Sequence, residues 1–156
     1  MHSVLVDNDR MNRLPFLSFF VSVSALAYVG CSLLFSRDEV ARVSSPDGRV
    51  DAFLFETNGG ATTSFGYEVE LGSKHSWRRK NAARLYGAVR NAQAYGVDLR
   101  WENDHTLVIE CLKTETPPEI KKSVDVDGRD VQILLHIGVE DKSAPAGGML
   151  FNLHRK

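Results

Sequence analysis

The sequence has few cysteines and none of the spacings that mark a metal or redox site. Its 156 residues include only two cysteines, Cys31 and Cys111, too few for a disulfide framework. No histidines or cysteines have the His-x-x-x-His or Cys-x-x-Cys spacing of a zinc site, so we expect no metal and no cofactor. A Gly-x-Ser-x-Gly nucleophile elbow is absent too, which removes the commonest sequence signal of a hydrolase.

The chain also lacks the positive charge of a nucleic-acid-binding protein. Its formal net charge is −1, so we predict no nucleic-acid partner. The basic residues are nevertheless concentrated, because residues 71–97 contain six of them and no acidic residue, whereas residues 98–141 contain eleven acidic and five basic residues. Either the two stretches neutralise each other across the fold, or a basic edge at Arg78, Arg79 and Lys80 binds anionic lipid headgroups.

One long apolar segment stands out against this background. Residues 14–35 are twenty-two residues without a charge, and about twenty helical residues span the hydrocarbon core of a bilayer. We therefore predict that this segment contacts the membrane, either as a transmembrane helix that stays attached or as a lipoprotein signal cleaved before Cys31, which would then carry the lipid. Met11 is an alternative start to Met1 and favours the signal, whereas the apolar residues that follow Cys31 favour the anchor.

This segment divides the chain into three parts. We expect an N-terminal tail at residues 1–13, the transmembrane anchor or lipoprotein signal at residues 14–35, and a soluble domain at residues 36–156. A composition of 43% hydrophobic and 25% charged residues is typical of a globular protein. A lone N-terminal apolar segment most often directs export, so we expect the C-terminal domain to be extracytoplasmic.

Turn signals and alternating hydrophobicity predict that the domain is mainly β. The segment 45–48, Ser-Pro-Asp-Gly, has proline where φ is preset and glycine where φ is positive, and therefore predicts a hairpin. The pair Asp127-Gly128 predicts a second hairpin. We expect strands at 40–44, 49–56, 65–71, 97–101, 106–112 and 131–139, and a closing edge strand at 149–153.

Residues 77–96 fit two structures equally well. Ala82, Leu85 and Val89 form a helical stripe, but Leu85, Gly87 and Val89 also alternate with polar residues as in a strand. The fold class that we predict is a mainly β, antiparallel sheet or sandwich-like domain behind a single N-terminal apolar helix. A helix within 77–96, which would make the domain α+β, stays open as the alternative.

Several short motifs together resemble a known protein family. These are Ser-Pro-Asp-Gly-Arg at 45–49, Phe-Leu-Phe-Glu at 53–56, Asn-Gly-Gly-Ala-Thr-Thr at 58–63, and Trp101 followed by Thr-Leu-Val-Ile at 106–109. In this order, behind an N-terminal anchor, they resemble a family of small bacterial envelope proteins of unknown function. The resemblance implies a β-rich exported domain in the bacterial cell envelope and favours a strand within 77–96. It implies no catalytic residues.

The glycine pair in the third motif is the candidate ligand site. Gly59 and Gly60, beside the hydroxyls of Thr62 and Thr63, could present backbone N–H groups to an anion. The segment has no lysine in the position that a nucleotide-binding loop requires. The alternative is a tight connection between two strands, with positive φ at one of the glycines.

Other residues that can carry chemistry have simpler structural explanations. Residues 125–130 resemble a calcium loop, but their glycine is in the wrong position, so we expect a hairpin turn. Asp104 and His105 could polarise a nucleophile, but no nucleophile motif accompanies them. Cys111 shares a face with apolar residues and His136 lies in an apolar run, so we expect a buried thiol and a strand histidine.

The function predicted from these observations is a membrane-anchored envelope protein that acts as a non-enzymatic interaction or structural module and contacts another envelope protein or the envelope surface. The alternative is an envelope hydrolase or a domain that binds a small ligand or anion through the Gly59-Gly60 loop.

Overall fold

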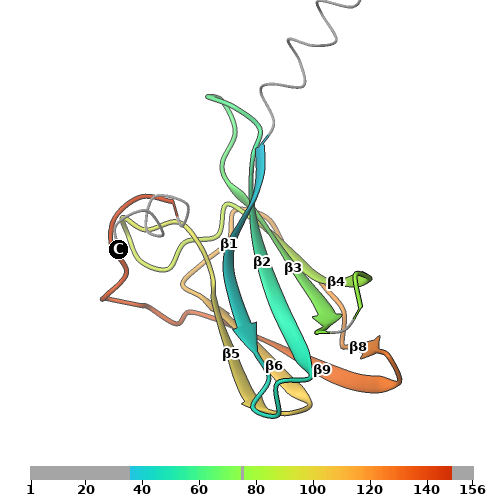
Figure 1. Cartoon of the computed structure of the whole chain (residues 1–156). Coiled ribbons are helices and arrows are strands. Elements are labelled where there is room, and N and C mark those ends of the chain that lie inside the picture. Colours follow the sequence, from blue (N-terminus) through green and yellow to red (C-terminus); the bar gives the residue numbers. More distant parts are fainter. Residues whose placement is uncertain (1–35, 75, 149–156) are drawn as a thin grey trace, which may run out of the picture. The chain divides into compact units, whose positions relative to one another are not determined.

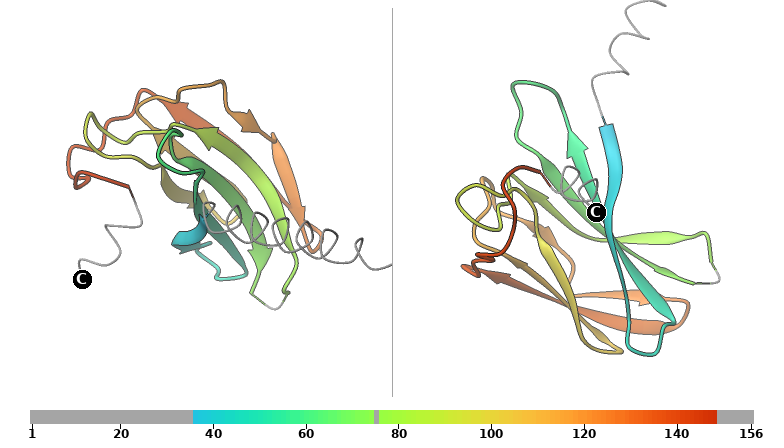
Figure 2. Two further views of the ribbon diagram at one scale, coloured as in Figure 1. Left: turned by 90° about the horizontal axis from the view of Figure 1, so that it is seen from above. Right: turned by 60° about the vertical axis from the view of Figure 1, so that its left-hand side comes forward.

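The computed structural model describes residues 36–74 and 76–148, and these residues form two β-sheets packed face to face (Figures 1 and 2). The first sheet has five strands in the order β1-β2-β3-β4-β7, and the second has four in the order β5-β6-β9-β8. The strands are β1 (Ser36–Ser44), β2 (Val50–Asn58), β3 (Gly66–Ser73), β4 (Arg79–Tyr86), β5 (Asp98–Asn103), β6 (Thr106–Cys111), β7 (Glu119–Ile120), β8 (Ser123–Val126) and β9 (Arg129–Ile137).

The predicted mainly β fold is confirmed. The apolar segment 14–35, the lipidation candidate Cys31 and the predicted edge strand 149–153 lie outside the described residues. Within residues 36–74 and 76–148, no helix is long and apolar enough to cross a membrane.

Both predicted hairpins are present, and their turns have the expected backbone geometry. The amide of Gly48 donates to the carbonyl oxygen of Ser45 over 2.8 Å, and Gly48 has a φ of 68°. In the second turn, Asp127 and Gly128 have φ values of 52° and 85°, so both central residues are left-handed, as a type I′ hairpin requires. The turn residues therefore set the pairing of β1 with β2 and of β8 with β9.

The ambiguous stretch 77–96 is a strand followed by an irregular loop, which confirms the strand alternative. Val69 pairs with Ala83 and Glu70 with Asn81, so β4 contains an extra residue, Ala82, at a bulge. The bulge buries both Ala82 and Ala83, each at most 1% exposed. Two neighbouring buried residues interrupt the two-residue alternation of a strand, which explains why periodicity alone could not identify it.

The second sheet is mixed, whereas an antiparallel sheet was predicted. β6 and β9 pair in parallel, from Thr106 opposite Gln132 to Cys111 opposite Ile137. Parallel neighbours need a crossover. Here the chain leaves β6, pairs with β4 of the first sheet as β7, and returns to the second sheet as β8.

The core lies between the inward faces of the two sheets. The first sheet contributes Leu54, Val69 and Leu71, and the second contributes Leu107 and Ile109, all 0% exposed. Trp101 of β5 donates its indole N–H to the carbonyl oxygen of Val43 of β1 over 3.1 Å, which joins the two sheets along one side. The sheets thus form one packed unit on which the candidate sites are held.

Candidate functional site

Two phenylalanines on the outer face of the first sheet are covered by arginines. Phe53 and Phe55 of β2 point away from the core, yet they are only 6% and 5% exposed. The guanidinium of Arg37 lies 3.7 Å from the ring centre of Phe55, and those of Arg79 and Arg42 lie 3.9 and 4.5 Å from that of Phe53. Cation–π stacking of this kind buries the rings without a third layer of chain.

The predicted headgroup-binding triplet is largely engaged in these internal contacts. Besides stacking on Phe53, Arg79 lies 3.9 Å from Glu39. The Nζ atom of Lys80 lies 3.2 Å from Asp125, across the gap between the two sheets. All three residues are exposed, and Arg78, whose guanidinium lies 5.7 Å from the ring centre of Trp77, makes no ion pair with another described residue. Headgroup binding through the triplet stays a prediction, and it would have to compete with these contacts.

Trp77 is the most exposed large apolar residue of the described chain. Its side chain is 88% exposed, in the connection between β3 and β4. Gly72 pairs with Arg79 at the base of this connection, and Val50 pairs with Ser73 at the same level. Trp77 therefore belongs to the end of the sheet at which β2 begins.

The opposite end of the sheet is where the chain enters it. Ser36 pairs with Asn58, and Gly66 pairs with Tyr86. The loop 59–65, which holds the glycine pair, joins β2 to β3 at this end (Figure 1). The indole of Trp77 and the loop thus occupy opposite ends of the same sheet.

The glycine loop is folded onto itself. Gly60 has a φ of 103°, as the structural alternative expects, and its amide donates to the side chain of Asn58 over 2.8 Å. The amide and the hydroxyl of Thr63 both donate to the carbonyl oxygen of Gly60, over 3.2 and 3.1 Å. A Cβ atom at Gly59 would meet the Thr63 hydroxyl at 2.8 Å. These contacts use two loop amides internally, and the anion site at Gly59, Gly60, Thr62 and Thr63 stays a prediction.

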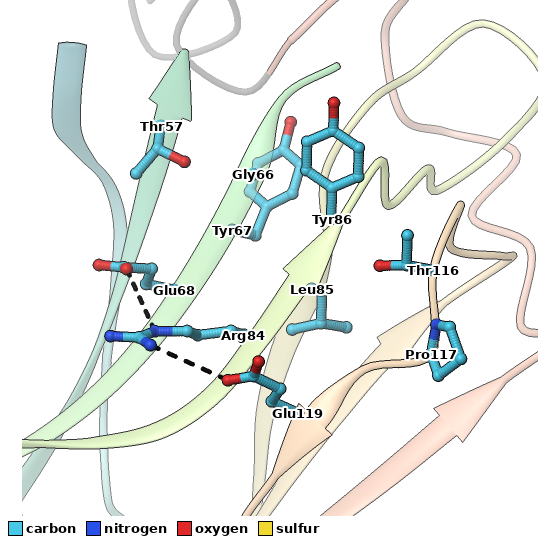
Figure 3. Close-up of a pocket in the computed structure, with 10 residues that line it drawn as sticks. All are labelled: Thr57, Gly66, Tyr67, Glu68, Arg84, Leu85, Tyr86, Thr116, Pro117 and Glu119. Carbon is cyan, nitrogen blue, oxygen red and sulfur yellow. Dashed lines mark ion pairs between the residues drawn. The ribbon is translucent and has the colours of Figure 1, made fainter. Parts of the chain in front are cut away.

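A groove lies directly beside this loop on the outer face of the first sheet (Figure 3). Its volume is about 260 Å³, and its lining residues come from β2, β3, β4, β7 and the segment before β7: Thr57, Gly66, Tyr67, Glu68, Arg84, Leu85, Tyr86, Thr116, Pro117 and Glu119. Gly66 has no side chain to fill it, and a Cβ atom there would lie 2.5 Å from the Thr57 hydroxyl. The groove therefore lies over a glycine that is the first residue of the central strand β3.

The two ends of the groove differ chemically. Tyr86, 39% exposed, stands beside Gly66 at one end, while Arg84 lies between Glu68 and Glu119 at the other (Figure 3). The Arg84 guanidinium lies 3.4 Å from Glu68 and 3.9 Å from Glu119. One end thus offers an aromatic ring and the other offers planar hydrogen-bonding groups.

Tyr86 is held by the glycine loop. The amide of Ser64 donates to the Tyr86 hydroxyl over 3.0 Å, and the Ser64 hydroxyl donates to Glu115. The first bond holds the phenol hydroxyl at the mouth of the groove, and the second ties the loop to Glu115. The loop therefore takes part in shaping a candidate site even though two of its own amides are used internally.

The Ser-Pro-Asp-Gly turn is the centre of a different network, at the end of the sheet that carries Trp77. The carboxylate of Asp47 lies 2.7 Å from the guanidinium of Arg129, and its backbone amide donates to Asp104 over 2.9 Å. The Arg129 hydrogen bond, with help from the hydroxyl of Ser45, holds the pKa of Asp47 well below its usual value of 3.8. The network connects the turns that follow β1, β5 and β8.

The residues with other predicted roles are accounted for by the fold. Asp104 faces the amide of Asp47, and the ring of His105 lies 3.4 Å from the carbonyl oxygen of Asp130, so the two do not form a catalytic pair with each other. Cys111 is 1% exposed, and burial raises the pKa of its thiol, as expected of a small apolar residue. His136 is a strand residue, as predicted, with its ring 3.5 Å from Glu110.

A buried polar cluster was not predicted from the sequence. Tyr67 and Glu56 are 1% and 3% exposed, and the Tyr67 hydroxyl donates to the Glu56 carboxylate over 2.8 Å. Arg90, whose side chain is 8% exposed, lies 3.4 Å from Asp98 and 3.7 Å from Asp141. The cluster fastens the segment after β9 to the start of β5. The sequence held one indication of this cluster: Glu56 is a charged residue at a strand position that faces the core.

The described residues contain no group of three or more histidine, cysteine or acidic side chains arranged to hold a metal ion. Comparison of the chain with family models, with curated proteins and with solved structures found no match. The resemblance to envelope proteins therefore stays a prediction. Among the described residues, two other hollows lie beside His105 and Arg129 and beside Val89 and Lys113. The functional proposals rest on the groove and on the exposed tip at Trp77.

Proposed function

We propose that this protein is a membrane-anchored, non-enzymatic interaction module of the bacterial cell envelope. Residues 14–35 attach it to the membrane, and the β domain lies outside the cytoplasm and contacts another envelope protein. The observation that supports the proposal best is the position of Trp77, which is 88% exposed at the end of the sheet opposite the strand residue that follows the anchor, Ser36.

The length of the strands sets the distance between the exposed tip at Trp77 and the strand end at Ser36. β3 has eight residues, and at roughly 3.3 Å per residue it spans about 26 Å. Ser36 follows the predicted anchor directly, so Trp77 is held roughly this distance along the sheet from the point of attachment. An exposed indole beside the exposed Arg78 matches the aromatic and arginine residues that dominate binding hot spots between proteins.

Crosslinking in cells that produce the full chain tests the contact. A photoreactive residue at position 77 should give one discrete protein adduct, whereas the same residue at Ile120, 39% exposed and away from the tip, should not. Equal adduct patterns at both positions, or adducts to lipid alone at position 77, would contradict a protein partner at the tip.

The mode of attachment has a separate test. The intact mass of protein extracted from membranes distinguishes the two alternatives for residues 14–35. A mass that corresponds to cleavage before Cys31 plus acyl chains identifies a lipoprotein. A mass of the uncleaved chain, starting at Met1 or Met11, identifies a transmembrane anchor. Full-length protein recovered only in the soluble fraction would refute membrane attachment.

A second function, ligand binding, is favoured by the groove at the other end of the sheet. The glycine loop borders this groove and holds Tyr86 at its mouth. A ligand at this position would lie beside the strand end that follows the anchor and would leave the Trp77 tip free for a partner.

A further inference from the structure

The groove over Gly66 combines an aromatic ring with groups suited to hydroxyls, and we propose that it binds one ring of a saccharide. This inference rests on the second function above and is independent of the contact at Trp77. It names a ligand class for a surface that borders the glycine loop.

Charge argues against an anionic ligand. The charged residues that line the groove are Arg84, Glu68 and Glu119, so the lining carries one negative charge more than positive. The single guanidinium already has both carboxylates within 4 Å, at 3.4 and 3.9 Å. Glu68 is also paired with Arg37 over 2.8 Å. A phosphate or carboxylate would therefore meet no unpaired cation among the lining residues and would lie beside the exposed carboxylate of Glu119. A neutral, hydroxyl-rich ligand meets no such repulsion.

Strand pairing argues against a peptide added to the sheet edge. Recognition by strand addition needs unpaired backbone N–H and C=O groups. At the groove, the edge of β4 is occupied by β7, because Ala83 pairs with Ile120 and Arg84 with Glu119. The backbone of β3 is paired on both sides. The groove therefore offers side chains, and one face of a sheet, as its binding surface.

The shape suits a flat ring with polar edges. A pyranose has a face of C–H groups and a rim of hydroxyls, and Tyr86 supplies a rigid apolar ring for that face. At the other end, the 3.9 Å separation between Arg84 and Glu119 exceeds hydrogen-bond distance, so both groups keep the capacity to bond a hydroxyl. Glu119 and Arg84 are 78% and 59% exposed in their side chains and are accessible from solvent.

Size limits the ligand to a single unit of a longer molecule. The groove volume of about 260 Å³ falls below the roughly 300–1,000 Å³ of sites that enclose a drug-sized ligand. One sugar ring fits this space, with its neighbours lying outside it. The same ring chemistry is available from a wall glycan or from a glycolipid headgroup, and the experiment must separate these sources.

The test is a titration of the purified full chain in a detergent without sugar groups. The probes are soluble oligosaccharides of N-acetylglucosamine and of glucose, vesicles that contain a glycolipid, the acyclic polyol sorbitol, and inorganic phosphate. We expect binding of at least one saccharide probe and none of sorbitol, which has no ring face. Binding to glycolipid vesicles alone identifies a headgroup as the source, and binding to soluble oligosaccharides identifies a glycan. No binding of any saccharide refutes the proposal, and binding of phosphate alone would favour the anion site of the glycine loop.

Variants locate the site. Tyr86→Leu removes the ring and should weaken saccharide binding roughly tenfold, whereas Tyr86→Phe keeps the ring and should stay within about threefold of the unmodified chain. Glu119→Gln neutralises a carboxylate whose side chain is 78% exposed, and it should also weaken binding. Trp77→Ala, at the opposite end of the sheet, is the matched control. Equal affinity in Tyr86→Leu and Tyr86→Phe, with Glu119→Gln also unchanged, would overturn the assignment, and so would a loss of saccharide binding in Trp77→Ala alone.

Discussion

The buried hydrogen bond between Tyr67 and Glu56 makes a direct test of the packing between the sheets. Both side chains are almost fully buried, and the phenol donates to the carboxylate over 2.8 Å. Tyr67→Phe keeps the ring and its contacts but removes that donor. The Glu56 carboxylate then loses one hydrogen bond in an environment from which water is largely excluded.

The expected cost follows from the charge of the acceptor. A hydrogen bond to a charged group contributes about 1.5–3 kcal/mol, more than a bond between neutral groups, so Tyr67→Phe should lower the free energy of unfolding by about this amount. For a domain of this size, roughly 4 °C of melting temperature corresponds to 1 kcal/mol. The melting temperature should therefore fall by about 6–12 °C.

The pH dependence of stability provides a second test of the Tyr67→Phe prediction. Burial first, and then the charge of Glu56, raise the pKa of Tyr67 far above its usual value of 10.0. The folded state keeps a proton that the unfolded chain releases above that pH, so this contribution to stability is complete below pH 10 and is lost as the pH rises further. Tyr67→Phe should therefore show a smaller loss of stability above pH 10 than the unmodified chain.

The assay is guanidinium unfolding of the full chain at neutral and alkaline pH, followed by tryptophan fluorescence. Tyr95→Phe is the matched control, because Tyr95 packs edge-on against Phe65 and its hydroxyl has no hydrogen-bond partner among residues 36–74 and 76–148. A cost below about 0.5 kcal/mol in Tyr67→Phe, or one equal to that of Tyr95→Phe, would refute the reasoning.

Three further predictions concern the turns and the buried thiol. Because Arg129 lowers the pKa of Asp47, the contribution of Asp47 is present above its usual pKa of 3.8 and is lost as the pH falls below it. Asp47→Asn should thus be less stable at neutral pH and less sensitive to acid, and parallel urea-midpoint curves against pH for the two proteins would contradict this. Gly128 has a φ of 85° with open space around it, so Gly128→Val should cost about 1–3 kcal/mol through backbone strain alone. Gly128→Asn should cost less in the same denaturation assay, and equal costs would exclude strain as the cause. Cys111 in a Cys31→Ser background should react with a thiol reagent only on unfolding, because it is 1% exposed and its pKa is raised, and rapid labelling of the native chain would disprove its burial.

Local signals predicted most of the strands, but they did not predict β7 and β8 and left β4 undecided. Pro46 and Gly48 identify their hairpin from the sequence alone. Pro46 presets its own φ and Gly48 adopts a positive φ, and neither property depends on distant residues. The parallel pairing of β6 with β9 has no such signal, because it depends on the crossover between them. The outward position of Phe53 was hidden for a similar reason, because the arginines that cover it come from β1 and β4.

The candidate site was only partly predictable. The glycine pair was identified from its composition, but the neighbouring groove requires the register that sets Gly66 opposite Tyr86. That register could not be predicted while residues 77–96 fitted both a helix and a strand. Trp77 was equally hard to interpret, because a tryptophan in sequence predicts burial as readily as exposure, and only the position of its hairpin connection determines which.

The contacts of Asp47 change how the Ser-Pro-Asp-Gly motif should be interpreted. Its carboxylate binds Arg129 and its amide binds Asp104, so the motif holds together three turns that are distant in sequence. In this protein the motif therefore closes one end of the sandwich, and this structural role explains its presence without an activity. Trp77 differs, because an indole that is 88% exposed contributes little to burial. Its replacement should leave folding intact, so a functional defect in Trp77→Ala can be attributed to a lost contact, whereas a defect at Asp47 cannot.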